Sequence, residues 1–247
     1  AQAEYDLGEA YYNGVSVEEN LEEAFKWFKK AAKKGHVKAQ YSTAYLLDYG
    51  EGVEENNVEA VQWYSKAISK GHLLSHYELA LILIEGEDGV ESNPEKAILL
   101  LTKAADQGLD LAQFELGVLF DEGEDVPKDI VKAVKYYKLA VAQNNADAQN
   151  NLGLLYQYGK GVQQSFSEAK RLFTLSASQD VGQAYYNLGN LYAEGEGVSK
   201  NYTKAAEFYE KAVGLCHKEA KEKLSEIYSV GGFGLKKDLN KVQELQE

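Results

Sequence analysis

Apolar residues recur along the chain with the spacing of amphipathic helices. Ala24, Trp27, Phe28 and Ala31 stand at i, i+3, i+4 and i+7, and segments 60–67 and 133–140 repeat this arrangement. The spacing places one apolar stripe along a helix with about 3.6 residues per turn. Polar segments rich in glycine separate the stripes. The pattern therefore predicts an all-α protein made of many short helices.

The helical pattern itself repeats at a nearly constant interval. Segments such as AQYSTA, AQFELG and AYYNLG align at starts 3, 39, 75, 112, 148, 184 and 220, which lie 36 or 37 residues apart. We expect six full repeats and a partial seventh, which together cover the chain as one domain over 1–247. A single helix pair cannot bury its apolar stripes alone, so stacked repeats form a solenoid with a continuous core and a concave face.

Each repeat is predicted to contain two helices with recognisable boundaries. Its sixth residue is small, which lets two helices approach closely: Gly8, Ala44, Ala80, Gly117, Gly153, Gly189 and Ser225. The second helix is expected to start after a residue of the type that caps helix N-termini. These residues are Asn20, Asn56, Asn93, Asp129, Ser165, Asn201 and Asp238. Gly35, Gly71 and Gly108 are expected to end second helices, and Cys216 occupies an equivalent position.

These motifs resemble a known repeat family. The pattern A-x-x-x-L-G-x-x-Y is followed by loops such as GEGVEEN and GEGVSKN and then by A-x-x-W/Y-Y/F-x-x-A. At a fixed register this combination resembles the Sel-1-like repeat, a relative of the tetratricopeptide repeat. Departures are Ser16 in the first loop and Leu100 and Leu101 where other repeats carry aromatics. The resemblance implies a right-handed α/α superhelix that serves as a protein-interaction scaffold or adaptor.

Net charge narrows the classes of partner. The chain holds 26 Lys and Arg against 39 Asp and Glu, which gives a net charge of −13. Such acidity disfavours nucleic acid and anionic membranes as partners. No apolar run approaches the roughly 20 residues of a spanning helix, so we expect no membrane insertion. One cysteine slightly favours a cytoplasmic location, although an exported protein with its signal peptide removed would have the same composition.

Catalytic, metal and cofactor sites are not expected. His72 and His76 have metal-pair spacing, but they straddle a boundary between repeats. His36, His72 and His217 share one register, which favours capping or packing. Asn201 begins a glycosylation sequon, yet its register favours a helix cap. A β-lactam or cell-wall hydrolase, suggested by cysteine-rich relatives, is a less favoured alternative because the single cysteine excludes their paired-cysteine pattern.

The candidate binding surface follows from the family resemblance. In such solenoids the first helix of each pair lines the concave face, at repeat positions three, four, seven, ten and eleven. These positions hold eleven acidic residues, nine aromatic residues and one basic residue, Lys223. The partner-binding candidates are Tyr41, Tyr45, Tyr49, Tyr77, Glu78, Phe114, Glu115, Asp121, Glu122, Asn150, Asn151, Tyr158, Tyr186, Asn187 and Asn190.

This surface predicts a protein or peptide partner that is basic or amphipathic. Tyrosine rings anchor interfaces, asparagine amides can pair with a peptide backbone, and carboxylates attract basic groups. Two alternatives stay open: the acids only solubilise the protein, or the chain is a structural repeat segment of a larger protein. End-to-end self-association is also possible where a terminal repeat exposes apolar surface.

Overall fold

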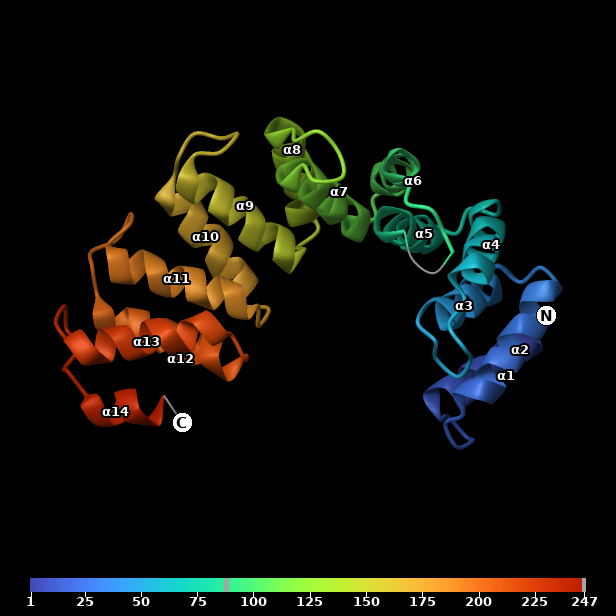
Figure 1. The fold of residues 1–247 in the computed structure, drawn as a ribbon, viewed down its shortest axis with the longest axis horizontal. Coiled ribbons are helices and arrows are strands. Elements are labelled where there is room, and N and C mark those ends of the chain that lie inside the picture. The colour runs from blue at the N-terminus through green and yellow to red at the C-terminus, as the bar shows by residue number, and fades with distance from the viewer. Residues whose placement is uncertain (87–88, 246–247) are drawn as a thin grey trace. The chain divides into compact units, whose positions relative to one another are not determined.

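The computed structural model describes residues 1–86 and 89–245. In these residues the chain forms fourteen helices, joined by turns and loops (Figure 1). They are α1 (Gln2–Asn13), α2 (Leu21–Lys33), α3 (Val37–Asp48), α4 (Asn57–Ile68), α5 (Leu74–Glu85), α6 (Pro94–Asp106), α7 (Asp110–Glu122), α8 (Ile130–Ala142), α9 (Ala146–Tyr158), α10 (Phe166–Ala177), α11 (Gly182–Glu194), α12 (Tyr202–Gly214), α13 (Lys218–Val230) and α14 (Leu239–Glu244). The predicted all-α solenoid of helix pairs is confirmed.

The chain divides into two compact units. Unit 1 comprises Ala1–Leu119 and Gly123–Pro127, and unit 2 comprises Phe120–Glu122 and the chain from Lys128 onward. Consecutive helices pack against each other from α1 to α6 in unit 1 and from α8 to α14 in unit 2. We call the odd-numbered helices first helices and the even-numbered ones second helices. In unit 1, α3 and α5 lie on one side and α4 and α6 on the other (Figure 1).

The predicted N-caps start the second helices. Asn20 Oδ1 accepts a hydrogen bond from the Glu23 backbone N–H at 3.0 Å, and Asn201 Oδ1 accepts one from Lys204 at 2.9 Å. Asn56, Asn93, Asp129, Ser165 and Asp238 cap their helices in the same way. Each such cap typically contributes about 1 kcal/mol. The interpretation of Asn201 as a helix cap is confirmed.

Small residues at the sixth repeat position bring the helices of a pair together. A Cβ placed on Gly153 would lie 2.6 Å from the Phe173 ring, and one on Gly189 would lie 2.4 Å from the Tyr209 ring. No real Cβ tolerates such distances, so the ring of the second helix rests directly on the glycine of the first. Phe173 and Tyr209 are fully buried through this contact. The predicted close approach is confirmed.

The second helices end where the sequence indicated. Gly35 follows α2 with a φ of 86°, in the left-handed region that favours glycine. Cys216 follows α12 with a φ of 62° and carries an exposed free thiol. The seventh pair differs from the others, because its second helix α14 has only six residues. In the described part of the chain, no helix has the length and apolar character to cross a membrane.

Candidate partner-binding surface

In unit 1, tyrosine hydroxyls of one repeat reach carboxylates of the next. Tyr41 Oη on α3 donates to Glu78 Oε1 on α5 at 3.2 Å. Tyr12 Oη at the end of α1 donates to Glu51 Oε2, in the loop after α3, at 3.3 Å. Both pairs join residues 37 or 39 apart, about one repeat. At these two steps of unit 1, the stacking of repeats therefore places a phenol against a carboxylate.

Glu78 is the most enclosed of these acids. It is only 7% exposed, yet it lies on the first-helix side with the predicted tyrosines. Burial raises the pKa of the Glu78 carboxyl, while hydrogen bonds from Tyr41 and Tyr49 lower it in part. Two phenols thus provide the donors that a lysine or arginine would usually supply to a buried acid.

The tyrosines of this surface stay protonated. Burial first, and then the charge of Glu9, raises the pKa of Tyr5 to about 12. Burial and the charge of Glu115 raise the pKa of Tyr77 to about 12 as well. Burial raises the pKa of Tyr41 and Tyr49 too, with Glu78 as the next cause. At neutral pH these side chains act as hydrogen-bond donors and ring surfaces, and not as phenolate nucleophiles.

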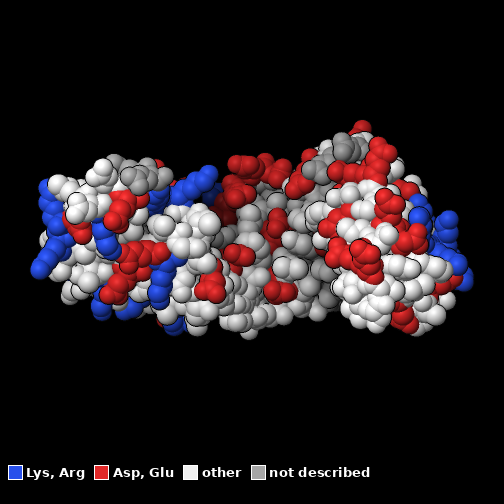
Figure 2. Space-filling view, turned by 90° about the horizontal axis from the view of Figure 1, so that it is seen from below, with Lys and Arg blue, Asp and Glu red and all other residues white. Residues whose placement is uncertain are grey.

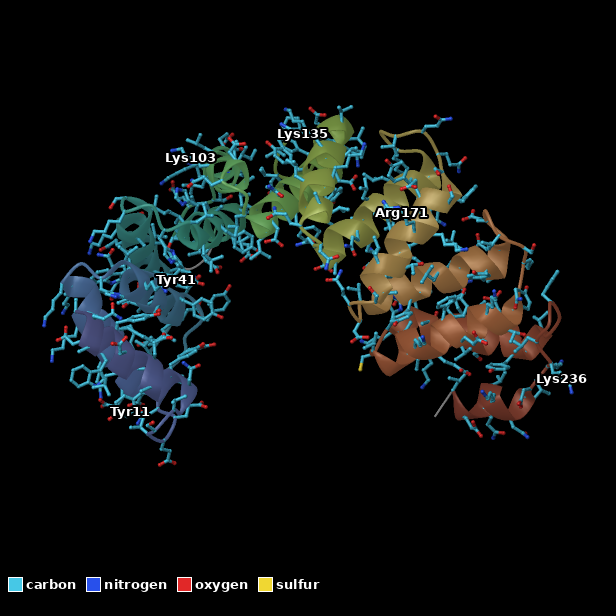
Figure 3. All side chains as sticks on the ribbon, turned by 180° about the vertical axis from the view of Figure 1, so that it is seen from behind. Tyr11, Tyr41, Lys103, Lys135, Arg171 and Lys236 are labelled. Atoms are coloured by element: carbon cyan, nitrogen blue, oxygen red, sulfur yellow. The ribbon has the colours of Figure 1, made fainter. Side chains whose placement is uncertain are left out.

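A hollow of about 450 Å³ opens between α1 and α3. Rings of Tyr5, Tyr12, Tyr41 and Tyr45 line it, together with the charged side chains of Glu9 and Lys38. We call it the α1–α3 hollow. Tyr41 lies on α3 on the first-helix side of unit 1, whereas Lys103 lies on the second helix α6 (Figure 3).

Histidines lie at the N-termini of several first helices. His36 Nδ1 accepts a hydrogen bond from the Ala39 backbone N–H at 3.2 Å, and its ring stacks on Tyr5 with centroids 4.5 Å apart. In unit 2, His217 caps α13 and stacks on the predicted Tyr186 at 4.6 Å. The capping and packing role predicted for these histidines is confirmed.

His72 and His76, which have metal-pair spacing in the sequence, are engaged in packing and local hydrogen bonds. The His72 ring packs on Tyr41, with centroids 4.7 Å apart, and its Nδ1 lies 2.9 Å from Ser75 Oγ. His76 Nδ1 lies 3.1 Å from the His72 carbonyl oxygen. Across residues 1–86 and 89–245 no group of three or more His, Cys, Asp or Glu side chains is arranged to hold a metal ion.

The end of α7 places its predicted residues differently. Phe114 and Glu115 are half-buried on the helix, and Glu122 is exposed. Asp121 Oδ1 forms an ion pair with Lys128 Nζ at 3.4 Å, and the Asp121 carbonyl also accepts a hydrogen bond from that ammonium. A lysine of the same chain therefore partly neutralises this acid.

In unit 2, two of the predicted asparagines bond to each other across repeats. Asn187 Nδ2 on α11 donates to Asn150 Oδ1 on α9 at 2.8 Å, and Asn150 Nδ2 donates to Asn151 Oδ1 at 3.2 Å. Asn150 is 5% exposed and Asn187 is 4% exposed. These amides join the repeats, so pairing with a peptide backbone remains a prediction for them.

The other predicted residues of unit 2 lie nearer to solvent. Asn151 Nδ2 donates to Tyr137 Oη at 3.3 Å, and Tyr209 Oη donates to Asn190 Oδ1 at 2.7 Å. Tyr158, at the end of α9, is 60% exposed. Of the predicted tyrosines in this unit, Tyr158 therefore offers the largest free ring surface.

Two charged residues of the surface were missed by sequence reasoning. Glu51 lies in the loop between two glycines, and Lys38 is the second residue of α3. Neither occupies one of the five repeat positions assigned to the concave face. Tyr5, Glu9 and Tyr12 do occupy such positions, and the repeat register was the signal that marks them.

Basic counter-charges are distributed unevenly in unit 1. Lysines in α2 and directly after it form ion pairs with Glu4, Glu23 and Glu59 at 2.7–2.8 Å. Within residues 1–86 and 89–245, Glu9, Glu51 and Glu78 form no ion pair with lysine or arginine. Figure 2 shows acidic side chains across the visible face of unit 1, at the right of the view, and lysines at its outer edge. The first-helix side of unit 1 is therefore a region of uncompensated negative charge.

Solved structures share this architecture. A Sel1 repeat protein from Oxalobacter formigenes is 27% identical, with a TM-score of 0.84 over 98% of this chain and 95% of its own. A protective antigen of uropathogenic Escherichia coli with an SLR fold is 27% identical, with a TM-score of 0.63 over 99% of this chain and 60% of its own. An immunity protein of Pseudomonas aeruginosa, at 24% identity, has a TM-score of 0.54 over 85% of this chain and 79% of its own, a likeness of fold alone.

Family comparison agrees with the repeat period found in the sequence. Among proteins with curated functions none matches this sequence. The model of the Sel1 repeat matches residues 1–36, 37–72, 73–109, 110–145, 146–181 and 182–213. These segments have the predicted spacing and begin two residues before each predicted start. The chain therefore belongs to the Sel1 repeat family.

Proposed function

We propose that this protein is an adaptor whose first-helix surface binds a basic or amphipathic segment of a protein partner. Sel1 repeat proteins are generally interaction scaffolds without enzymatic activity. The observation that carries the finer proposal is the set of Glu9, Glu51 and Glu78, whose carboxylates face tyrosine hydroxyls in place of basic side chains. Both units are proposed to belong to this one scaffold.

The chemistry of the surface favours a basic partner over an acidic one. Carboxylates on the first-helix side raise the cost of bringing a further negative charge near and attract a positive one. Tyrosine rings add apolar contact area with few rotatable bonds, which is why they serve as interface anchors. The exposed ring of Tyr158 offers a similar anchor in unit 2. An amphipathic basic segment satisfies both features at once.

Peptide binding to the full chain tests the proposal. A fluorescently labelled peptide rich in Lys, Arg and Leu is compared with a peptide of the same length in which Glu replaces each basic residue. We expect the basic peptide alone to bind, and its affinity to fall as salt is raised, because at physiological ionic strength salt largely screens exposed charges that lie more than about 8 Å apart. Equal binding of both peptides, or affinity independent of salt, would overturn the proposal.

A further inference from the structure

We propose that the α1–α3 hollow is a specific pocket for one arginine or lysine side chain of a bound protein segment. The inference rests on the proposed function and states which chemical group of the partner enters the surface, and where. Its ligand is a cationic head on an aliphatic stem, and its walls are the rings of Tyr5, Tyr12, Tyr41 and Tyr45.

The size and walls of the hollow suit a single long side chain. Its volume of about 450 Å³ lies within the roughly 300–1,000 Å³ that small-ligand pockets occupy. The Tyr41 and Tyr45 rings lie with centroids 6.0 Å apart, and the Tyr41 ring also packs on Tyr64 and His72. These contacts fix the Tyr41 ring in place, and the hollow is lined by four tyrosine rings in all. Aromatic rings gathered around one space attract cations.

Hydrogen bonds hold the walls in position before any ligand arrives. Tyr12 donates to Glu51 at 3.3 Å and Tyr41 to Glu78 at 3.2 Å. The Tyr5 hydroxyl bonds with Glu9 and with Ser42. Three of the four wall phenols, those of Tyr5, Tyr12 and Tyr41, are thus tied to partners on α1, α3, α5 or the loop after α3, so these rings lose little freedom when a guest enters. A prearranged pocket spends less of its binding energy on ordering itself.

The charges at the hollow favour a cation. Glu9 lines it, and Glu51 and Glu78 accept from two of its wall tyrosines. Lys38, an exposed side chain at the start of α3, is the lysine among the lining residues. His72 also lines the hollow, and burial lowers the pKa of its imidazole, so it is neutral at pH 7. Three carboxylates therefore oppose one ammonium, and an anionic guest is disfavoured.

The test uses the 247-residue chain and three short blocked peptides that differ in one central residue. One carries arginine, one lysine, and one citrulline, which has almost the shape of arginine without its charge. Binding is followed by the backbone amide shifts of the isotope-labelled chain. We expect arginine and lysine to shift amides of α1 and α3 around the hollow, and the citrulline peptide to bind several-fold more weakly.

Two variants with opposite expected effects make the test specific. Glu9→Gln removes a lining charge with its shape retained and should weaken binding of the arginine peptide roughly two- to fivefold. Lys38→Gln removes the opposing charge and should strengthen binding by a similar factor, a gain that misfolding cannot produce. Glu22→Gln is the matched control, since it removes an exposed acid of the second helix α2, and it should leave affinity unchanged.

The outcomes separate this inference from the proposed function. Citrulline binding as tight as arginine binding would overturn the pocket, as would Glu9→Gln and Lys38→Gln variants with unchanged affinity. Shifts confined to other parts of the chain, with the basic amphipathic peptide still bound, would overturn the pocket and leave the proposed function standing. Failure of both the arginine peptide and the basic amphipathic peptide to bind would overturn both.

Discussion

The hydroxyl of Tyr41 donates to the carboxylate of Glu78 at 3.2 Å, across one repeat of the solenoid. The pair joins α3 to α5 and satisfies an acid that is almost wholly enclosed. A phenol satisfies the carboxylate without cancelling its charge, whereas a lysine would cancel it. The contact therefore stabilises the stack of repeats without adding a positive charge to the proposed binding surface.

Removing the hydroxyl of Tyr41 should destabilise the protein. In Tyr41→Phe the enclosed Glu78 loses one of its two phenol donors, and such a loss typically costs about 1–3 kcal/mol. The free energy of unfolding, measured in urea, checks this. Tyr11→Phe is the matched control because the Tyr11 hydroxyl forms no hydrogen bond with a described residue. An equal decrease in the free energy of unfolding of both variants would show that the Tyr41–Glu78 hydrogen bond makes no particular contribution to stability.

Raising the pH above 10 should lower stability. The pKa values of Tyr5 and Tyr77 rise from 10.0 to about 12 on folding. Unfolded chains therefore release these protons first, so the contribution of the neutral phenols is complete below pH 10 and is lost between 10 and about 12. Urea unfolding at a series of pH values measures the slope. The variant Tyr5→Phe/Tyr77→Phe should have a shallower slope, and an unchanged slope would count against this cause.

Mild acid should also lower stability, through the histidine caps. Burial lowers the pKa of His36 and His72 below the ordinary histidine value of 6.5. Their neutral rings contribute fully above 6.5, and the contribution is lost as pH falls below that value, since the unfolded chain takes up the protons first. Protonation also turns the accepting Nδ1 of the His36 cap into a donor.

His36→Asn separates this effect from other acid effects. Asparagine caps a helix without a titrating ring, so thermal unfolding of this variant should lose less stability between pH 7 and 5 than that of the wild type. His36→Ala should cost about 1 kcal/mol at pH 7, because the cap is lost altogether. Identical acid sensitivity in wild type and His36→Asn would rule out the His36 cap as a source.

Replacing glycine by alanine should destabilise the protein where the glycine touches a neighbouring helix, and should not do so where it touches nothing. Gly153→Ala places a methyl 2.6 Å from the Phe173 ring, so the helices must separate. Such overpacking typically costs about 1–3 kcal/mol. Gly214→Ala, in α12, meets no atom within 4 Å and should be neutral or stabilising by up to about 1 kcal/mol. An equal change in the melting temperature of both variants would contradict the close-contact role of Gly153.

Local features of the fold were predictable from the sequence, and contacts between repeats were not. The cap at Asn20 depends on residues three positions apart, so composition and register suffice to locate it. The Asn150–Asn187 bond spans 37 residues, and it depends on how one repeat is rotated against the next. The same holds for Tyr12 and Glu51. The repeat register therefore identified the candidate surface, whereas the hydrogen-bond partners of its side chains could be identified only from the three-dimensional structure.

The most direct test of the account is the affinity of the full chain for the labelled basic amphipathic peptide at low salt. Wild type is compared with Glu9→Gln/Glu51→Gln and with a control of equal charge, Glu18→Gln/Glu22→Gln, whose two acids are exposed and do not line the α1–α3 hollow. The account predicts that only the first pair of substitutions weakens binding, by roughly fivefold or more if two part-exposed charges add. Equal affinity in the two double variants would contradict the claim that the tyrosine-paired carboxylates form the binding surface.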